Sequence, residues 1–486
     1  MARGEYFAFR RLADIRERAV SLGLADAIGF AEDVSPARPD RAISSPIAAG
    51  PFALANRFVA HPMEGWDGDA ATGAPTPDTL RRWERMGGSG CALLWGVEAF
   101  AVAPEYRANR NQLLMSPPNL EAVSRGLALI RKASPHPLVV GAQLTCSGRF
   151  SHGRPEDSPL MLAYHHPELD RRLGAGPDTP LATDDELEGI PLHYVAAAHV
   201  AREAGFDFID IKACHRYFVN ETLAAKTRPG PYGGSFGNRT RFILMVLDAI
   251  RREVGPDFPI ACRLNAFDGV PFEEDPSTRR PGLKGRGRPG AYATPYLWGW
   301  GVDERNPLEP DPAEPLRLAG MLKDRGVFML SLSAGDPYSA PHFLRPTESP
   351  PIDGYQPHRD PLFEVATHFR LTRAFKEAYP GLAIVGSGYS YLRGFKAHAA
   401  EHNIAAGRVD LVGVGRALLS YPDEVRRILQ EGEAQPSRGC VICTGDSACT
   451  TGPRLGLKSG CIYDPHYADT NREISRKLSA MGLDRK

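Results

Sequence analysis

The segment Ala204–Phe242, with the sequence AGFDFIDIKACHRYFVNETLAAKTRPGPYGGSFGNRTRF, is the most informative part of the chain. It begins with Phe206–Ile211, where apolar residues alternate as in a strand packed against a core. Lys212, His215 and Tyr217 follow directly. Three proton-handling side chains after a buried strand are typical of barrel enzymes, whose chemistry lies at the C-terminal ends of the strands. A Gly-Gly turn and a helical pattern come next, so the segment predicts a strand-then-helix unit.

The same alternation recurs along the chain. The apolar stretches that qualify as strands are Phe58–Ala60, Ala92–Gly96, Leu138–Leu144, Phe206–Ile211, Ile260–Asn265, Phe328–Leu332, Ala383–Val385 and Val409–Val414. The helical patterns between them are Thr79–Met86, Asn119–Lys132, Asp184–Ala204, Asn238–Val254, Pro315–Arg325, Leu362–Tyr379 and Leu392–Ala405. Strands that are apolar throughout and separated by helices predict an α/β fold, a closed parallel (β/α)8 TIM barrel covered by helices.

Four segments depart from a minimal barrel. Residues 1–45 form an N-terminal extension with a charged amphipathic helix, the barrel spans residues 46–432, and residues 433–486 form a Cys-rich C-terminal segment. Two long strand-to-helix insertions, 269–315 and 333–361, fall on the active face, where they would wall a substrate pocket. The alternative is that these insertions are surface loops without a specific role.

Composition restricts the partners. The chain has 486 residues, of which 42% are hydrophobic and 24% charged, and its formal net charge is zero. Bulk electrostatics therefore indicate neither nucleic acid nor an anionic membrane as a partner. No apolar run reaches the roughly 20 residues of a membrane span, and the N-terminus lacks the apolar core of a signal peptide. We expect a cytoplasmic protein that acts on a small molecule. The N-terminal extension leaves a homo-oligomer open.

Three motifs carry a resemblance to a known family. Ala204–Phe242 resembles the signature of the Old Yellow Enzyme / NADH:flavin oxidoreductase family, and Asn56–Met63 resembles its Asn-Arg-x-x-x-x-Pro-Met motif. Gln143–Arg149 resembles the family's Gln-Leu-x-x-x-Gly-Arg. The resemblance covers roughly residues 45–465. It implies a TIM barrel that binds FMN and reduces activated C=C bonds.

FMN requires a polar edge for its pyrimidine ring and a cation near N1. The amide of Gln143 can donate and accept at once, and in the family this glutamine contacts the flavin. Arg263 lies on the fifth predicted strand, where a buried arginine is costly without an anionic partner. The electron-rich N1–C2 region of reduced flavin would supply one. The alternatives are a barrel glutamine bonded within the protein and an internal salt bridge of Arg263.

The phosphate of FMN requires donors near the last two strands. Gly386, Ser387 and Gly388 follow the seventh predicted strand, and Gly415 and Arg416 follow the eighth. Barrels often bind phosphate between the loops after strands 7 and 8, where backbone N–H groups are accessible. By resemblance, the flavin also lies beside three further residues, Pro62, Met63 and Ala99.

The catalytic candidates follow from the charge that develops during reduction. As hydride reaches the β-carbon of an activated alkene, the carbonyl oxygen gains negative charge, so donors placed there stabilise the transition state. Lys212 and His215 are the candidates for these donors. Tyr217 is the candidate acid for the α-carbon, because its ordinary pKa near 10 keeps it protonated. The alternatives are an ion-pair role for Lys212, an ordinary barrel-mouth histidine at 215 and a packing role for Tyr217.

The family pattern is broken at three positions. Glu64 stands where Thr or Cys usually follows the Pro-Met pair, Lys212 stands where relatives often carry His or Asn, and Cys146 stands where many carry His. A carboxylate near the flavin would disfavour its anionic reduced state or act as a base. Glu64 therefore keeps the oxidation of an amine open as a reaction.

Four cysteines lie close together after the barrel, at Cys440, Cys443, Cys449 and Cys461. Four thiolates suit a 4Fe–4S cluster or Zn²⁺, and the Cys-x2-Cys spacing does not favour a structural disulfide. The dienoyl-CoA reductase and trimethylamine dehydrogenase branch of the family carries a four-cysteine 4Fe–4S motif in this place. That branch has three residues between its second and third cysteines, whereas this chain has five. The alternatives are that these cysteines bind Zn²⁺ or that they bind no metal.

These observations lead to three hypotheses. The first is an FMN-dependent reductase of an enone or enoyl thioester, with electrons supplied through the 4Fe–4S cluster. Since no second GxGxxG motif follows Cys461, we expect the electrons to come from a separate donor protein or directly from NADH or NADPH. The second is a flavin-dependent amine dehydrogenase or demethylase. The third is a barrel without flavin that uses the cysteines as a zinc staple and binds partners.

Overall fold

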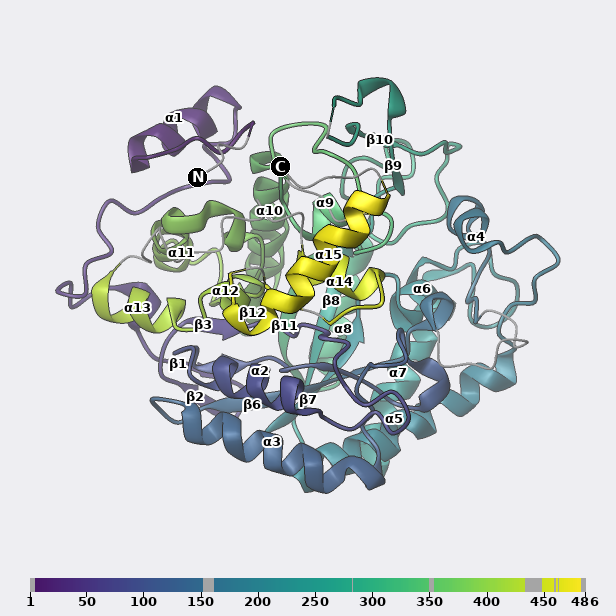
Figure 1. Cartoon of the computed structure of the whole chain (residues 1–486). Helices are drawn as coiled ribbons and strands as arrows, with labels where there is room; N and C mark the ends of the chain where they lie inside the picture. The colour runs from purple at the N-terminus through teal and green to yellow at the C-terminus, as the bar shows by residue number, and fades with distance from the viewer. Residues whose placement is uncertain are drawn as a thin grey trace.

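The computed structural model describes residues 5–151, 161–281, 283–348, 354–432, 448–458, 460–461 and 463–481. Within these residues the predicted strands form a closed parallel barrel (Figure 1). In barrel order they are β3 (Phe58–Ala60), β4 (Leu93–Leu94), β6 (Val139–Thr145), β7 (Phe208–Ala213), β8 (Ile260–Phe267), β11 (Val327–Ala334), β12 (Ala383–Gly386) and β13 (Leu411–Val414). The last strand, β13, pairs with β3 and closes the cylinder. The predicted TIM barrel is confirmed.

Helices cover the outside of the barrel (Figure 1). They are α2 (Pro77–Gly87), α3 (Leu120–Ala133), α5 (Asp184–Ala204), α7 (Phe236–Glu253), α8 (Ala313–Asp324), α10 (Leu362–Ala378) and α11 (Lys396–Ala405). One predicted boundary is wrong: the helix expected from Leu392 begins at Lys396. Residues Tyr389–Phe395 form 3-10 turns interrupted at Arg393, whose φ of 50° cannot belong to a right-handed helix.

Capping residues define both ends of α5, the helix that precedes β7. Thr183 and Glu186 form a capping box at the start of α5, because each side chain accepts a hydrogen bond from the other residue's backbone N–H. Gly205 ends the helix with a φ of 95°, a conformation that glycine adopts without strain. The chain then enters β7, whose side chains are all buried. Because β7 continues to Ala213, Lys212 lies within the strand rather than after it.

A hairpin closes the N-terminal end of the barrel. It consists of β1 (Ile47–Ala49) and β2 (Phe52–Leu54), which pair antiparallel. The ring of Phe52 contacts those of Phe208 and Phe328 from the barrel strands, with centroids 6.3 and 5.5 Å apart. These aromatic contacts fill the base, so the barrel is open to ligands at the opposite end.

The two terminal segments pack on the barrel. The N-terminal extension contains α1 (Leu12–Ser21) and is held by Arg41, which donates to the carbonyl oxygens of Ile428 and Leu429. The C-terminal segment contains α14 (Ala448–Arg454) and α15 (Ala468–Ala480), drawn in yellow across the front of Figure 1. Lys458 pairs with Asp78 of α2 at 2.5 Å, which ties this segment to the barrel.

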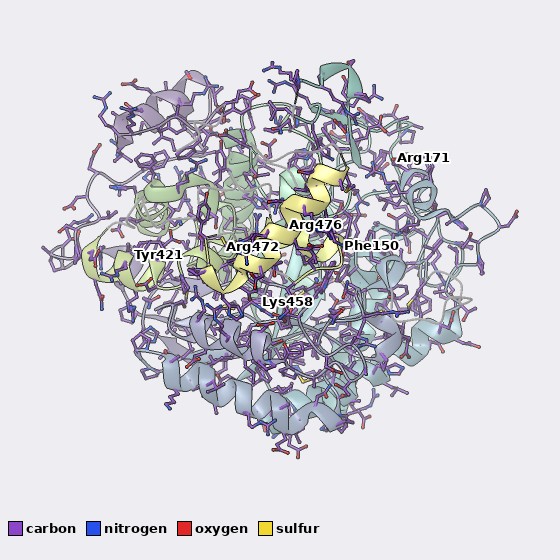
Figure 2. The ribbon with its side chains drawn as sticks, viewed as in Figure 1. Phe150, Arg171, Tyr421, Lys458, Arg472 and Arg476 are labelled. Atoms are coloured by element: carbon purple, nitrogen blue, oxygen red, sulfur yellow. The ribbon has the colours of Figure 1, made fainter. Side chains whose placement is uncertain are left out.

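Charged side chains mark the outer side of the C-terminal segment. Arg472 and Arg476 project from α15, and Lys458 lies on the loop before it (Figure 2). Both arginines are largely exposed and pair with acidic residues of their own helix. No helix among the described residues combines the length and apolar character needed to cross a membrane.

The remaining described helices and strands are short and lie mostly in the loops. They are β5 (Ala99–Ala101), β9 (Phe272–Glu274), β10 (Gly287–Pro289), α4 (Pro167–Leu173), α6 (Phe218–Ala224), α9 (Pro341–Leu344), α12 (Ala417–Ser420) and α13 (Glu424–Glu431). The pair β9–β10 belongs to the first predicted insertion and α9 to the second. The described parts of both insertions therefore contain short helices or strands.

Candidate active site

Two adjoining cavities, of about 240 and 160 Å³, lie at the C-terminal ends of the barrel strands. Together they reach the lower end of the range for small-molecule sites. They share residues from three barrel strands, from the second insertion and from α14. The shared residues are Pro62, Glu64, His215, Arg263, Pro337, Leu344, Cys449, Thr450 and Arg454. The insertion and the C-terminal segment thus wall one continuous site.

Most of the predicted site residues meet in this site. The larger cavity is lined by Pro62, Met63, His215, Arg263, Ser387, Gly388, Gly415 and Arg416. The smaller cavity adds Gln143, Lys212 and Tyr217. Ala99 and Gly386 lie in buried strands and do not line either cavity. The barrel therefore brings together predicted site residues that lie far apart in the sequence.

Gln143 is held by a buried carboxylate. Its Nε2 donates to Oδ2 of Asp210 at 2.6 Å, and the backbone N–H of Arg263 donates to Oδ1 of the same group, also at 2.6 Å. Burial raises the pKa of Asp210 to about 6. Since the amide nitrogen faces Asp210, the amide oxygen is the atom that can accept from a ligand. Asp210 was missed by the sequence analysis, although one acidic residue inside an apolar strand was a usable signal.

The guanidinium of Arg263 is buried and forms no ion pair with any described residue. The residue is 6% exposed, and its Nε has no hydrogen-bond partner among the described residues. Within the same residues we find no ion pair of Arg263, and the nearby Asp210 binds its backbone rather than its side chain. The salt bridge considered as an alternative does not form within the described chain. A buried cation in a cavity wall fits a ligand with an electron-rich edge.

His61 explains why residue 413 is a glycine. Ser387 Oγ donates to the carbonyl of Leu332 at 2.7 Å, so the 3.0 Å contact with His61 Nε2 has His61 as the donor. Its Nδ1 has no partner among the described residues. A Cβ on Gly413 would lie 1.9 Å from His61 Nε2. Gly413 is thus required by the packing of His61, a reason that the sequence did not disclose.

The other side of the site is a network around Glu64. Lys212 forms an ion pair with Glu64, and its Nζ lies 3.8 Å from the ring centroid of Tyr217. The hydroxyl of Tyr217 donates to Glu64 Oε2 at 2.9 Å. Because that proton is committed, Tyr338 is the donor in the 2.9 Å bond between the two tyrosine hydroxyls. The unusual Glu64 and Lys212 therefore compensate each other.

Burial and charge set the protonation of Tyr217 and His215. Burial, and then the charge of Glu64, raise the pKa of Tyr217 well above its ordinary value. Burial also lowers the pKa of His215 well below its ordinary value, so the ring is neutral. His215 Nε2 lies 3.1 Å from Ser333 Oγ.

The turn that carries His215 is strained. His215 and Arg216 have φ values of 65° and 56°, which is rare for residues other than glycine. Arg216 holds the turn through Asp336, with Nε and Oδ2 3.0 Å apart, and through Asn220, whose Oδ1 accepts from the Arg216 backbone at 2.8 Å. Strain of this kind is typical of functional sites.

Two of the four predicted cysteine ligands lie within the described residues. Cys440 and Cys443 lie outside the described residues. Cys449 lies in the first turn of α14 and lines both cavities, and Cys461 is half-buried further along. The metal cluster stays a prediction, and its third expected ligand lies in the wall of the candidate site.

A barrel with a polar cavity at the C-terminal ends of its strands defines an enzyme of the TIM-barrel class. Residues 43–277, just under half of the chain, match the model of the NADH:flavin oxidoreductase / NADH oxidase family. The solved complex of 2-naphthoyl-CoA reductase with 2-naphthoyl-CoA shares the fold. It gives a TM-score of 0.65 at 17% identity and covers 89% of this chain and 58% of that chain.

Curated relatives match over part of their length. NADH oxidase of Thermoanaerobacter brockii is 28% identical over 286 residues, 58% of this chain and 35% of that protein. A probable N-methylproline demethylase of Rhizobium meliloti (strain 1021) is 28% identical over 346 residues, 69% of this chain and 41% of that protein. 12-Oxophytodienoate reductase 2 of Arabidopsis thaliana is 27% identical over 264 residues, 54% of either protein. The chain thus spans about a third to a half of these relatives.

Proposed function

We propose that the protein is an FMN-dependent oxidoreductase that reduces an activated C=C bond, of the enone or enoyl-thioester type, in a small molecule. The observation that carries the proposal is the buried guanidinium of Arg263, which lines both cavities and forms no ion pair among the described residues. The match of residues 43–277 to the flavin oxidoreductase family model and the similarity to 12-oxophytodienoate reductase 2 support it.

The cavity residues fit FMN. Arg263 provides the cation for the electron-rich N1–C2 edge, and the amide oxygen of Gln143 can accept from a ring N–H. The phosphate is assigned to the loops after β12 and β13. The residues proposed there are Gly386, Ser387, Gly388, Gly415 and Arg416. Pro62, Met63 and Ala99 are assigned to the strand ends beside the ring. When bound and reduced, FMN supplies the hydride for the β-carbon of the substrate.

The network around Glu64 suits the proton-handling side of the reaction. His215 lines both cavities, and its neutral ring can donate one hydrogen bond to a substrate carbonyl oxygen. Tyr217 is the proposed acid for the α-carbon: its raised pKa keeps it protonated at neutral pH, and its hydroxyl would turn from Glu64 to the substrate to donate that proton. Tyr338, which donates to Tyr217, can return the proton. Lys212 neutralises the charge of Glu64. In this scheme Lys212 is a positioning residue.

The visible spectrum of the purified protein tests the proposal. We expect flavin absorption that bleaches anaerobically with NADH or NADPH and returns when 2-cyclohexenone or crotonyl-CoA is added. A colourless protein that binds no added FMN would contradict the proposal. It would favour the barrel without flavin, in which the cysteines hold zinc.

A second function is favoured by a specific observation. The probable N-methylproline demethylase matches over 69% of this chain, and an amine substrate would place positive charge near Glu64. In this direction the flavin would be reduced by an N-methyl amine. Anaerobic bleaching by N-methylproline, without recovery on addition of an enone, would select this function.

The electron supply is part of the proposal. We infer that Cys440, Cys443, Cys449 and Cys461 hold a 4Fe–4S cluster that passes electrons between FMN and a separate donor protein, with NADH or NADPH as the direct alternative. The position of Cys449 in the cavity wall supports a cluster close to the flavin. Iron and acid-labile sulfide in anaerobically purified protein test the cluster, and one equivalent of zinc in their place would contradict it.

A further inference from the structure

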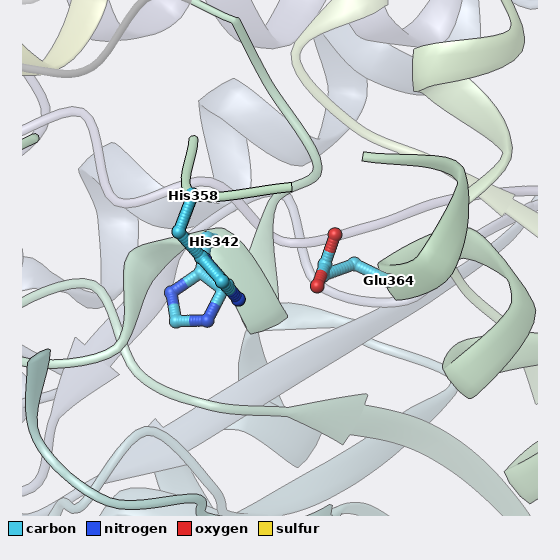
Figure 3. A group of neighbouring side chains, drawn as sticks. All are labelled: His342, His358 and Glu364. Atoms are coloured by element: carbon cyan, nitrogen blue, oxygen red, sulfur yellow. The ribbon is translucent and has the colours of Figure 1, made fainter. Parts of the chain in front are cut away.

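A second group of metal-ligating side chains lies behind the wall of the cavity. His342 belongs to α9, His358 lies in the loop before α10, and Glu364 lies in the first turn of α10 (Figure 3). One potential ligand atom of each residue lies within 4.8 Å of the other two. His342 and Glu364 are buried, and His358 is half-buried. The group is separate from the C-terminal cysteines and from the residues assigned to FMN.

Two ring nitrogens in this group lack partners. Nε2 of His342 and Nδ1 of His358 have no hydrogen-bond partner among the described residues. His342 is 6% exposed, so its unpaired nitrogen carries a desolvation cost. The two rings lie 5.1 Å apart with an interplanar angle of 89°. Ring packing alone does not explain two unpaired nitrogens.

The other polar atoms of the group are held in the way that metal ligands are. Nδ1 of His342 lies 2.7 Å from the hydroxyl of Tyr355, which leaves Nε2 as the coordinating atom. Arg359 donates to Oε1 of Glu364 at 2.7 Å, which leaves the second oxygen for a metal. The side chain of Arg359 is 35% exposed, so solvent screens its charge.

We propose that His342, His358 and Glu364 form a Zn²⁺ site that joins α9 to the start of α10. Two imidazoles and one carboxylate are a common zinc ligand set, with water in the fourth position. Ligands of a tetrahedral zinc lie about 3.4 Å apart, so the group closes by small side-chain rotations. Pro341 and Leu344 of α9 line the larger cavity. The metal fixes this wall, and the site does not depend on the flavin.

Metal binding to the full chain tests the proposal. Chelator-treated wild type should take up Zn²⁺ and gain about 3 °C in Tm at a hundredfold excess over Kd. His358→Gln and Glu364→Gln should each lose this gain and bind one equivalent less zinc. His166→Gln is the matched control, because both nitrogens of that buried ring already have partners. It should bind as much zinc as wild type.

Cobalt separates this site from the cysteines. Co²⁺ held by nitrogen and oxygen lacks the thiolate charge-transfer band that cysteine ligation produces. The one equivalent of Co²⁺ that wild type binds and His358→Gln does not should therefore lack this band. The proposal is overturned if wild type and both folded variants, checked by circular dichroism, bind the same zinc and show the same Tm. It is also overturned if the lost equivalent is thiolate-bound.

Discussion

The two sides of the cavity differ in how their charges are satisfied. On one side, Lys212 and Glu64 form an ion pair, and Tyr217 donates to the same carboxylate. On the other side, Arg263 is buried and forms no ion pair among the described residues, because the nearby Asp210 is hydrogen-bonded to Gln143 and to a backbone N–H. Because a buried charge is costly when unpaired, the first side is complete in the protein alone. The second side leaves a cation in the cavity wall that a ligand with an electron-rich edge would satisfy.

Removal of the proposed acid should have the largest effect. Tyr217→Phe should lower the rate of enone reduction by about 10²–10⁴-fold, the usual contribution of general acid catalysis. Reduction of the cofactor by NADH or NADPH should be unchanged, because Tyr217 lies on the paired side. Stopped-flow measurement of the two half-reactions checks this. Equal slowing of both half-reactions would show that Tyr217 supports the cofactor instead.

Breaking the ion pair should destabilise the protein. Lys212→Met leaves Glu64 as a nearly buried charge without its partner, so the free energy of unfolding should fall by about 3–5 kcal/mol. Glu64→Gln combined with Lys212→Met should recover most of that loss. Urea denaturation of the protein without cofactor gives the values for a double-mutant cycle. Additive losses would mean that the two residues do not compensate each other.

The carboxylate beside Arg263 should make stability depend on pH. The pKa of Asp210 is raised from 3.8 to about 6 in the folded state, so the folded protein binds this proton more tightly than the unfolded chain. Its contribution is present below about pH 4 and is lost as pH rises through 6, by up to about 3 kcal/mol. Asp210→Asn should remove this part of the slope in urea denaturation between pH 4 and 7. An unchanged slope would contradict the raised pKa.

Removal of the unpaired cation should have the smallest effect on stability and the opposite sign. Arg263→Met ends the burial of an uncompensated charge, so the cofactor-free protein should gain about 1–2 kcal/mol of unfolding free energy. Lys212→Met should lose stability under the same conditions. Thermal and urea denaturation of both variants sharpen the comparison. A loss of stability in Arg263→Met would mean that the guanidinium has a partner within the protein.

The barrel was predictable because its strands are apolar throughout and alternate with amphipathic helices, a pattern that depends on local sequence. Gln143 and Arg263 were also predictable, because a polar residue on such a strand requires a reason. Lys212 and Glu64 were each recognised as unusual, but their pairing joins positions 148 residues apart. Such a pairing depends on tertiary structure.

Other parts of the site had weaker signals. Tyr338 lies in a long insertion, where no periodicity identifies which side chain points inward. Gly413 lies within β13, and only the structure shows that His61 fills the space a side chain would need there. The metal-ligating group of His342, His358 and Glu364 spans a loop and two helices, so its sequence spacing matches no familiar motif. In each case the chemistry depends on which residues the folded loops bring together.

Titration of FMN into cofactor-free wild type and Arg263→Met tests the central claim most directly. The account predicts one FMN per chain in wild type and a Kd raised by about 10–100-fold in the variant, the usual cost of losing a charge-assisted hydrogen bond. Equal affinities, or a wild type that binds no FMN, would contradict it.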